Sequence, residues 1–355
     1  MDKQTHTKFN LNNFLMAFSS ALDNTIKVNK NNSKYSSKAF AYIAVSLAKE
    51  INLSNEYISD IFSYSIINKN AIFVQNLDYI PFNNRSFLDD KNSSFCINIA
   101  SYIIDNIKVQ NKTIINIEEL KNVILSNDTI LIELRDAFRK ISKNDSFWYD
   151  LMSNQIGFLL FEMLEDFTQE INFDNLIQFT AIVHDSIYHY TSRSYEEDCI
   201  DFKAYAIANL YKFESKDKAR FIIASHLSCV GYLFIPLDIV NKTDILHHSE
   251  YQIIKQVPYY TNYILQQVYG FSDIAKLCYN IYETIDGNGY PNKVGGSSLS
   301  LKNRALSILN IYQALREKRS YREKISKNEA FNILEDYSKN NKIDQSIVND
   351  LKTIL

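Results

Sequence analysis

Two short stretches in the last quarter of the chain combine charged side chains with residues that bend the backbone. The first is Asp286-Gly287-Asn288-Gly289-Tyr290-Pro291, and the second contains Arg319 and Arg322. Because guanidinium groups donate paired hydrogen bonds to phosphate, the second stretch is suited to hold a phosphorylated ligand. An alternative is that these arginines form ion pairs with Asp or Glu residues of neighbouring helices.

The first stretch predicts a bent loop after a helix. Gly287 and Gly289 permit positive φ, and Pro291 fixes φ where the chain leaves the loop. Asp286 is suited to accept hydrogen bonds from nearby backbone N–H groups, and Tyr290 to wedge the loop against the core. A purely structural loop and a loop that contacts a ligand both fit this pattern.

Together the two stretches resemble the HD-GYP domain, a bacterial metal-dependent phosphohydrolase that opens cyclic di-GMP. The family pattern H-H-E-x-x-D-G-x-G-Y-P is matched from Glu283 to Pro291. The later family pattern A-L-x-x-x-R-P-Y-R is matched at Ala314, Leu315, Arg319, Tyr321 and Arg322. The resemblance also places a family lysine on Lys242. It implies a set of candidate ligand-binding residues, namely Lys242, Asp286, Gly289, Tyr290, Pro291, Arg319 and Arg322.

The histidines and aspartates that hold the metal ions in this family have other residues in their places here. The replacements are Ser228 and Cys229 for the H-D pair, Tyr232 for the lysine after it, Val257 for the next histidine, Ile281 and Tyr282 for the paired histidines, and Asn310 for the later aspartate. The upstream histidine is also missing near residues 194–196. Since Ser, Asn and apolar side chains do not replace His and Asp as ligands, we expect no catalytic residue and no metal. The family would use iron or manganese as its cofactor, and none is expected here.

The remaining nucleophiles and histidines do not suggest a replacement site. The six histidines have no spacing that brings them together. His184 and His189 are expected to point in different directions on one helix, and His226 to face away from the family ligand position. Cys229 lacks a supporting motif and is expected to be a buried small hydrophobic residue.

These observations predict a catalytically inactive HD-GYP-like protein that acts as a binding or scaffolding module in cyclic dinucleotide signalling. Its partner would be cyclic di-GMP or another signalling protein. Two alternatives remain open. One is an active metal-dependent cyclic di-GMP phosphodiesterase with a rearranged site, and the other is a protein-interaction module with no nucleotide ligand.

The fold expected from composition and periodicity is all-α. Only four prolines and seven glycines occur in 355 residues, and no long segment alternates with period two. Helices are expected over 14–22, 36–50, 57–67, 176–190, 216–227, 250–256, 264–269, 274–284, 303–316 and 328–340. An apparent internal repeat places Ala44 and Ala48 on Ala204 and Ala208. We therefore expect two tandem HD-type helical domains, a degenerate HD-like domain over 1–165 and a degenerate HD-GYP domain over 170–355.

The net charge, the hydrophobicity pattern and the cysteine spacing limit the partners, metal sites and location that are expected. A net charge of −3 gives no reason to expect a nucleic-acid partner. No long uncharged apolar run predicts a membrane span, and no C-x-x-C pair predicts a zinc site. The expected location is cytoplasmic, and the oligomeric state is left open.

Overall fold

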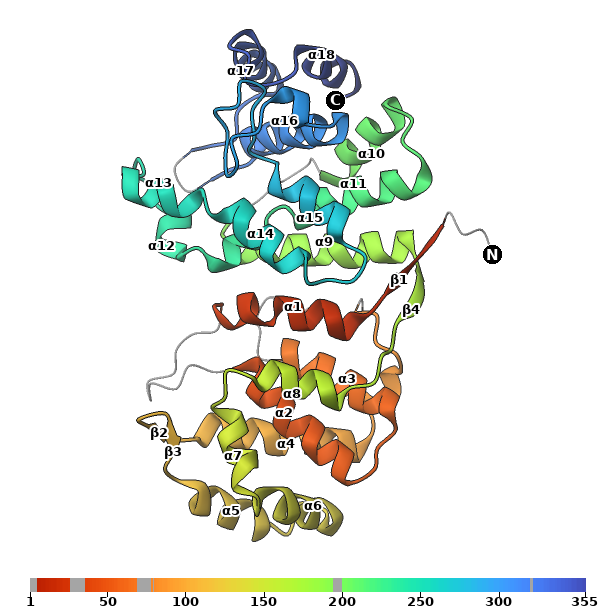
Figure 1. Ribbon diagram of the computed structural model, residues 1–355, viewed down its shortest axis with the longest axis vertical. Coiled ribbons are helices and arrows are strands. Elements are labelled where there is room, and N and C mark those ends of the chain that lie inside the picture. Colours follow the sequence, from red (N-terminus) through yellow and green to blue (C-terminus); the bar gives the residue numbers. More distant parts are fainter. Residues whose placement is uncertain (1–4, 26–35, 69–77, 79, 194–199, 320–321) are drawn as a thin grey trace. The chain divides into compact units, whose positions relative to one another are not determined.

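The protein is mainly helical, as the composition predicts, and its chain divides into two compact units (Figure 1). The structure is a computed structural model that describes residues 5–25, 36–68, 78, 80–193, 200–319 and 322–355. The first unit comprises residues 10–169, and the second comprises 170–355 together with the strand that ends at Phe9. The all-α class is confirmed. That each unit is an HD-type domain, as the ranges 1–165 and 170–355 implied, stays a prediction.

The first unit is built around α2. Its elements are α1 (Leu11–Asp23), α2 (Ser37–Glu50), α3 (Asn55–Ile67), the 3-10 helix η2 (Arg85–Leu88), α4 (Lys91–Asn106), β2 (Val109–Gln110), β3 (Thr113–Ile114), α5 (Ile117–Leu125), α6 (Ile132–Ser142), α7 (Asp145–Leu151) and α8 (Ile156–Met163). Helix α2 contacts α1, α3, α4, α6 and α8, and nearly all of its apolar side chains are buried. A helix that is apolar on most sides must be enclosed by others, which explains its central place.

The second unit is built in the same way around α11. Its elements are β1 (His6–Phe9), β4 (Gln169–Asn172), α9 (Phe173–Tyr190), α10 (Ile200–Leu210), α11 (Ser215–Leu227), the 3-10 helix η3 (Val230–Phe234), α12 (Leu237–Val240), α13 (His248–Ile254), α14 (Val257–Leu265), α15 (Ser272–Tyr279), the 3-10 helix η4 (Gly296–Ser298), α16 (Leu301–Arg316), α17 (Lys327–Lys339) and α18 (Gln345–Ile354). Helix α11 contacts α9, α10, α15 and α16. It thereby holds together the helices from which the candidate site residues project.

The sequence repeat corresponds to a repeated local structure. Helices α2 and α3 are joined by a turn in which Asn52 has a φ of 57°, and α10 and α11 by a turn in which Lys212 has a φ of 51°. In each turn the following N–H bonds back to a buried alanine, Leu53 to the carbonyl of Ala48 and Phe213 to that of Ala208. The two turns lie 160 residues apart, which is the spacing of the repeat.

Short strands occur where the sequence predicted none. Strand β1 pairs with β4, and β2 pairs with β3 in an antiparallel hairpin. The first pairing is extended by the Phe173 N–H, which donates to the carbonyl of Thr5 at 3.0 Å. Phe9, at the end of β1, packs against Phe179 and Phe271 with ring centroids 5.9 and 6.3 Å apart. Strands of two to four residues are too short to produce a detectable alternating pattern.

Two predicted helices end earlier than expected. Helix α14 ends at Leu265 and not at Tyr269, and α15 ends at Tyr279 and not at Thr284. The start of α15 at Ser272 is close to the predicted residue 274, whereas α14 begins at Val257, seven residues before the predicted start at residue 264. The early end of α15 matters for the site, because it places the two residues at the family's paired-histidine positions in a turn.

Candidate functional site

The loop of residues 286–291 is held in place by a buried glutamate. Glu283 is 2% exposed, and its two carboxylate oxygens accept hydrogen bonds from the N–H groups of Asn292 at 2.6 Å and Val294 at 3.1 Å. The carboxylate of Asp286 accepts bonds from the Asn288 N–H at 3.0 Å and the Thr284 hydroxyl at 2.5 Å. These bonds hold the pKa of Asp286 below its ordinary value. Both carboxylates that the motif retains are therefore engaged in fixing the loop.

The two glycines of the loop have different roles, and one role was predicted wrongly. Gly287 has a φ of +73°, as predicted, whereas Gly289 does not have a positive φ. Gly289 is required because the chain folds onto itself there, and an added Cβ would lie 2.5 Å from the Cα of Glu283. After it, the Tyr290–Pro291 peptide bond is cis, and the Tyr290 ring stacks on Tyr282 with centroids 5.0 Å apart. The close approach, and not the left-handed region, accounts for Gly289.

The three predicted basic side chains each bind a different partner. Arg322 donates to the carbonyls of Ala314 at 2.7 Å and Leu315 at 3.2 Å, so it caps the C-terminal end of α16. Lys242 bonds Glu250 at 2.6 Å, which holds the pKa of Glu250 below its ordinary value. Arg319 forms an ion pair with Glu317 at 3.2 Å. The alternative of pairing with carboxylates thus holds in part for Arg319, whose partner Glu317 lies two residues away and not on a neighbouring helix, whereas Arg322 contacts backbone carbonyls.

Three of the residues at the family's metal-ligand positions are unsuited to hold a metal ion. Val257 and Ile281 are 0% and 1% exposed and offer no donor atom. Burial raises the pKa of Cys229 to about 12, so this thiol stays protonated, and it donates to the carbonyl of His226 at 3.3 Å. In the described ranges, no three His, Cys, Asp or Glu side chains converge in a way that could hold a metal ion. The upstream position near 194–196 lies outside the described residues.

A group of aromatic and charged side chains lies at the same place. We call it the arginine–tyrosine cluster, and it consists of Tyr188, Arg193, Tyr232, Tyr282, Tyr290, Glu317 and Arg319. Tyr232 and Tyr282 are themselves at family site positions, and their hydroxyl oxygens are 3.5 Å apart. The guanidinium of Arg193 lies 3.6 Å from the centre of the Tyr232 ring. This guanidinium brings a permanent positive charge to the family's metal-ligand region.

A buried carboxylate completes the cluster. Glu317 is fully buried, accepts a hydrogen bond from the Tyr188 hydroxyl at 2.9 Å and pairs with Arg319. Arg193 also lies 5.6 Å from the centre of the Tyr188 ring. Among the described side chains that make up the cluster, two guanidinium groups face one carboxylate, which leaves one positive charge in excess.

This excess charge acts on the tyrosine hydroxyls. Burial alone would raise the pKa of Tyr232, but the positive charges of Arg193 and Arg319 outweigh burial and lower that pKa below its ordinary value. The pKa of Tyr282 lies well above its ordinary value, because burial and the neighbouring Tyr232 both oppose its ionisation. The environment of Tyr232 therefore favours negative charge.

Sequence reasoning missed Arg193 and Glu317. Arg193 follows α9 through a turn in which Ser192 has a φ of 53°, and the Arg193 N–H bonds to the carbonyl of Tyr188 at 2.9 Å. Glu317 directly follows the end of α16. Neither residue is specified by a motif: Arg193 precedes the missing upstream histidine, and Glu317 occupies a variable position of the family pattern, two residues before Arg319.

Two histidines are closer together than the sequence predicted. The rings of His184 and His226 are both buried, with centroids 6.0 Å apart. His226 bonds the hydroxyl of Thr180 at 3.0 Å and the carboxylate of Asp201. Burial lowers the pKa of His184, which favours its neutral form. These contacts indicate that His184 and His226 are hydrogen-bonded residues of the core.

A family model matches part of the second unit. Residues 179–347 match the model of the HD domain. The match lies within the second unit and covers the elements from α9 to the start of α18.

Similar proteins act on cyclic dinucleotides. The chain is 36% identical over 105 residues to the 3′3′-cGAMP-specific phosphodiesterase 1 of Vibrio cholerae, covering 30% of this chain and 24% of that protein. It is 26% identical over 98 residues to the cyclic di-GMP phosphodiesterase PdeB of Borreliella burgdorferi, covering 26% of this chain and 25% of that protein. The matching segments thus span about a quarter of each relative.

A solved structure matches over nearly the whole chain. The cyclic GMP-AMP-specific phosphodiesterase V-cGAP3 of V. cholerae aligns with a TM-score of 0.54 and 14% identity, covering 98% of each chain. At this identity the similarity concerns the fold alone. Among the helices of the described chain, none is long and apolar enough to cross a membrane.

Proposed function

We propose that the second unit binds a cyclic dinucleotide without hydrolysing it. The observation that carries this proposal is the arginine–tyrosine cluster, which stands where the family resemblance places the metal ligands. The relatives act on 3′3′-cGAMP and cyclic di-GMP, and the loop of residues 286–291 matches the HD-GYP motif.

The absence of hydrolysis follows from the donor chemistry of the residues present. Metal-assisted cleavage of a phosphate ester needs cations that neutralise the phosphate and lower the pKa of a bound water. Cys229 is protonated, and Val257 and Ile281 have no donor atoms. Arg193 and Arg319 supply positive charge, but a guanidinium group is always protonated and does not generate hydroxide. The chain therefore retains a means of attracting phosphate without a means of activating water.

The binding chemistry uses the two kinds of side chain in the cluster. Guanidinium groups donate bidentate hydrogen bonds to phosphate oxygens, and tyrosine rings offer faces on which bases stack. The cluster continues outward from Tyr290 through Lys255 to Tyr251. The ammonium group of Lys255 lies 5.2 Å from the centre of the Tyr290 ring and 5.8 Å from the centre of the Tyr251 ring. Tyr251 is 45% exposed, so the series of rings and cations reaches the surface.

Calorimetry tests the proposal. We expect 3′3′-cGAMP or cyclic di-GMP to bind the purified protein, with affinity unchanged by EDTA. Arg193→Gln or Arg319→Gln should weaken binding at least about tenfold, the equivalent of one charge-assisted hydrogen bond. Arg220→Gln is the control, because Arg220 has the same side-chain exposure as Arg319, 19%, and pairs with Asp273 outside the cluster.

Three results would contradict the proposal. Absence of binding by the wild type would favour a scaffolding protein with no nucleotide ligand. Equal loss of affinity in Arg220→Gln would show that the cluster is not the site. The third result is release of linear dinucleotide in the presence of Mn²⁺ or Fe²⁺, measured by chromatography and abolished by EDTA. It would favour an active phosphodiesterase with a rearranged site.

A further inference from the structure

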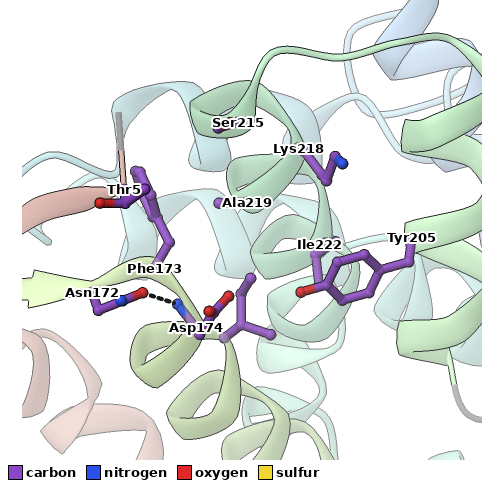
Figure 2. A pocket seen from close by; sticks show the side chains of 10 residues that line it. Thr5, Asn172, Phe173, Asp174, Tyr205, Ser215, Lys218, Ala219 and Ile222 are labelled. Atoms are coloured by element: carbon purple, nitrogen blue, oxygen red, sulfur yellow. Dashed lines mark hydrogen bonds between the residues drawn. The ribbon is translucent and has the colours of Figure 1, made fainter. Parts of the chain in front are cut away.

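A cavity lies at the opposite end of α9 from Arg193. It has a volume of about 270 Å³ and is bordered by the first turns of α9 and α11 and by α10 (Figure 2). Helix α9 has 18 residues, so about 27 Å separates its two ends. The cavity is therefore separate from the arginine–tyrosine cluster. Its volume is close to the lower end of the range for small-molecule sites.

The floor of this cavity is apolar. Phe173 and Ile177 of α9 and Ala219 and Ile222 of α11 line it, and all four are at most 8% exposed. Such a floor favours an aliphatic or aromatic group over a hydrated one. The apolar floor therefore predicts that the part of the ligand that contacts it is apolar.

The α9 side of the cavity presents negative charge. The carboxylate of Asp174 lines it, and among the described residues this side chain makes no hydrogen bond or ion pair. The hydroxyl of Tyr205 points from α10 toward the side where Asp174 lies (Figure 2). Burial and the negative charges of Asp174 and Asp201 raise the pKa of Tyr205, so its hydroxyl stays protonated. A carboxylate beside a phenol oxygen accepts hydrogen bonds from an ammonium group.

The α11 side presents donors. Ser215, the exposed first residue of α11, lines the cavity, and Lys218 lies one turn further along the helix. The Lys218 ammonium donates to the side-chain oxygen of Asn209 at 2.6 Å, which fixes its position. An ammonium group has three donors, so two remain for a ligand. These groups are suited to a carboxylate.

We propose that this cavity binds a small zwitterion with an apolar side chain, of the class of free aliphatic α-amino acids. The ammonium group of the ligand lies at Asp174 and Tyr205, its carboxylate at Ser215 and Lys218, and its side chain on the apolar floor. The proposal does not depend on nucleotide binding by the arginine–tyrosine cluster, because the two sites share no residue.

Calorimetry with three probes that share the same branched aliphatic side chain tests this assignment. L-leucine has both charged groups, 4-methylpentanoate lacks the ammonium group, and 3-methylbutylamine lacks the carboxylate. We expect leucine to bind at least about tenfold more tightly than either analogue, because each lost group removes a charge-assisted hydrogen bond. Asp174→Asn should weaken leucine binding about tenfold and leave 4-methylpentanoate unaffected. Lys218→Met should weaken leucine binding and leave 3-methylbutylamine unaffected.

Asp238→Asn is the matched control. Asp238 is also an exposed carboxylate in the first turn of a helix of the same unit, but it does not line the cavity. Its removal should leave all three affinities unchanged. The assignment is overturned if leucine shows no saturable heat up to about 10 mM. It is equally overturned if Asp174→Asn weakens binding of all three probes alike, or not at all, while the thermal midpoint is retained.

Discussion

Removal of the Glu283 carboxylate should release the loop of residues 286–291 while leaving the surrounding helices folded. Glu283 is 2% exposed, and both of its oxygens accept backbone hydrogen bonds from residues beyond the loop. In Glu283→Ala the N–H groups of Asn292 and Val294 lose their acceptor. In Glu283→Gln one acceptor remains, but an amide NH₂ then faces a backbone N–H.

The expected cost follows from these two bonds. A hydrogen bond to a charged acceptor contributes about 1.5–3 kcal/mol. Asn292 is exposed and Val294 partly so, which lets water replace some of the loss. We therefore expect Glu283→Ala to lower the free energy of local opening by about 2–4 kcal/mol.

Amide hydrogen exchange measures this opening directly. At tenfold per 1.4 kcal/mol, exchange of the Asn292 and Val294 amides should accelerate by about 30- to 700-fold. Amides in the middle of α11 should keep their protection. Glu323→Gln is the control, because Glu323 is 77% exposed and its ion pair with Lys318 is expected to contribute little.

Unchanged exchange at the two amides in Glu283→Ala would refute this account of the loop. A different failure is equally informative. If Glu283→Gln left protection intact and abolished a metal-dependent phosphodiesterase activity, the carboxylate would act in catalysis and not in holding the loop.

Three further predictions concern single residues or small groups of residues. Gly289→Ala should lower the thermal midpoint by overpacking worth about 1–3 kcal/mol, whereas Gly295→Ala, whose added Cβ comes no closer than 3.6 Å to another atom, should be nearly neutral. Arg322→Met should destabilise the protein by about 1–2 kcal/mol in urea unfolding, because two carbonyls at the end of α16 lose their donors. Burial raises the pKa of Cys96 and Cys229 to about 12 in the fold. The free energy of unfolding should therefore fall as pH rises from 9 to 12, by about 1.4 kcal/mol per pH unit for each thiol. Cys96→Ala should reduce this slope, and an unchanged slope would contradict the reasoning.

Most helices were predictable because their apolar spacing and caps are local features of the sequence. Ser36 and Ser54 both cap helices through their side chains, and Pro258 begins one. The end of α15 was not predictable, since apolar residues continue past Tyr279 while the chain turns toward the bonds made by Glu283. A long-range contact of this kind leaves no periodic signal.

The candidate site was predictable only where a motif defines it. The family spacing located Tyr232 and Tyr282 as replacements, and the structure brings their hydroxyls to 3.5 Å. It could not locate Arg193, which belongs to no motif and reaches the Tyr232 ring through a turn. A guanidinium that brings positive charge to the region of missing metal ligands is visible only once the chain is folded.

The pairing of β1 with β4 sets the order in which the protein can mature during translation. About 160 residues separate Phe9 from Gln169, so at about 5–20 residues per second β1 leaves the ribosome about 8–32 s before its partner strand. The first unit is continuous from Asn10 to Gln169 and can complete within that interval. A fragment that starts at Glu170 would have to fold with the aromatic faces of Phe179 and Phe271 uncovered by Phe9, so isolating the second unit requires supplying that short strand from elsewhere.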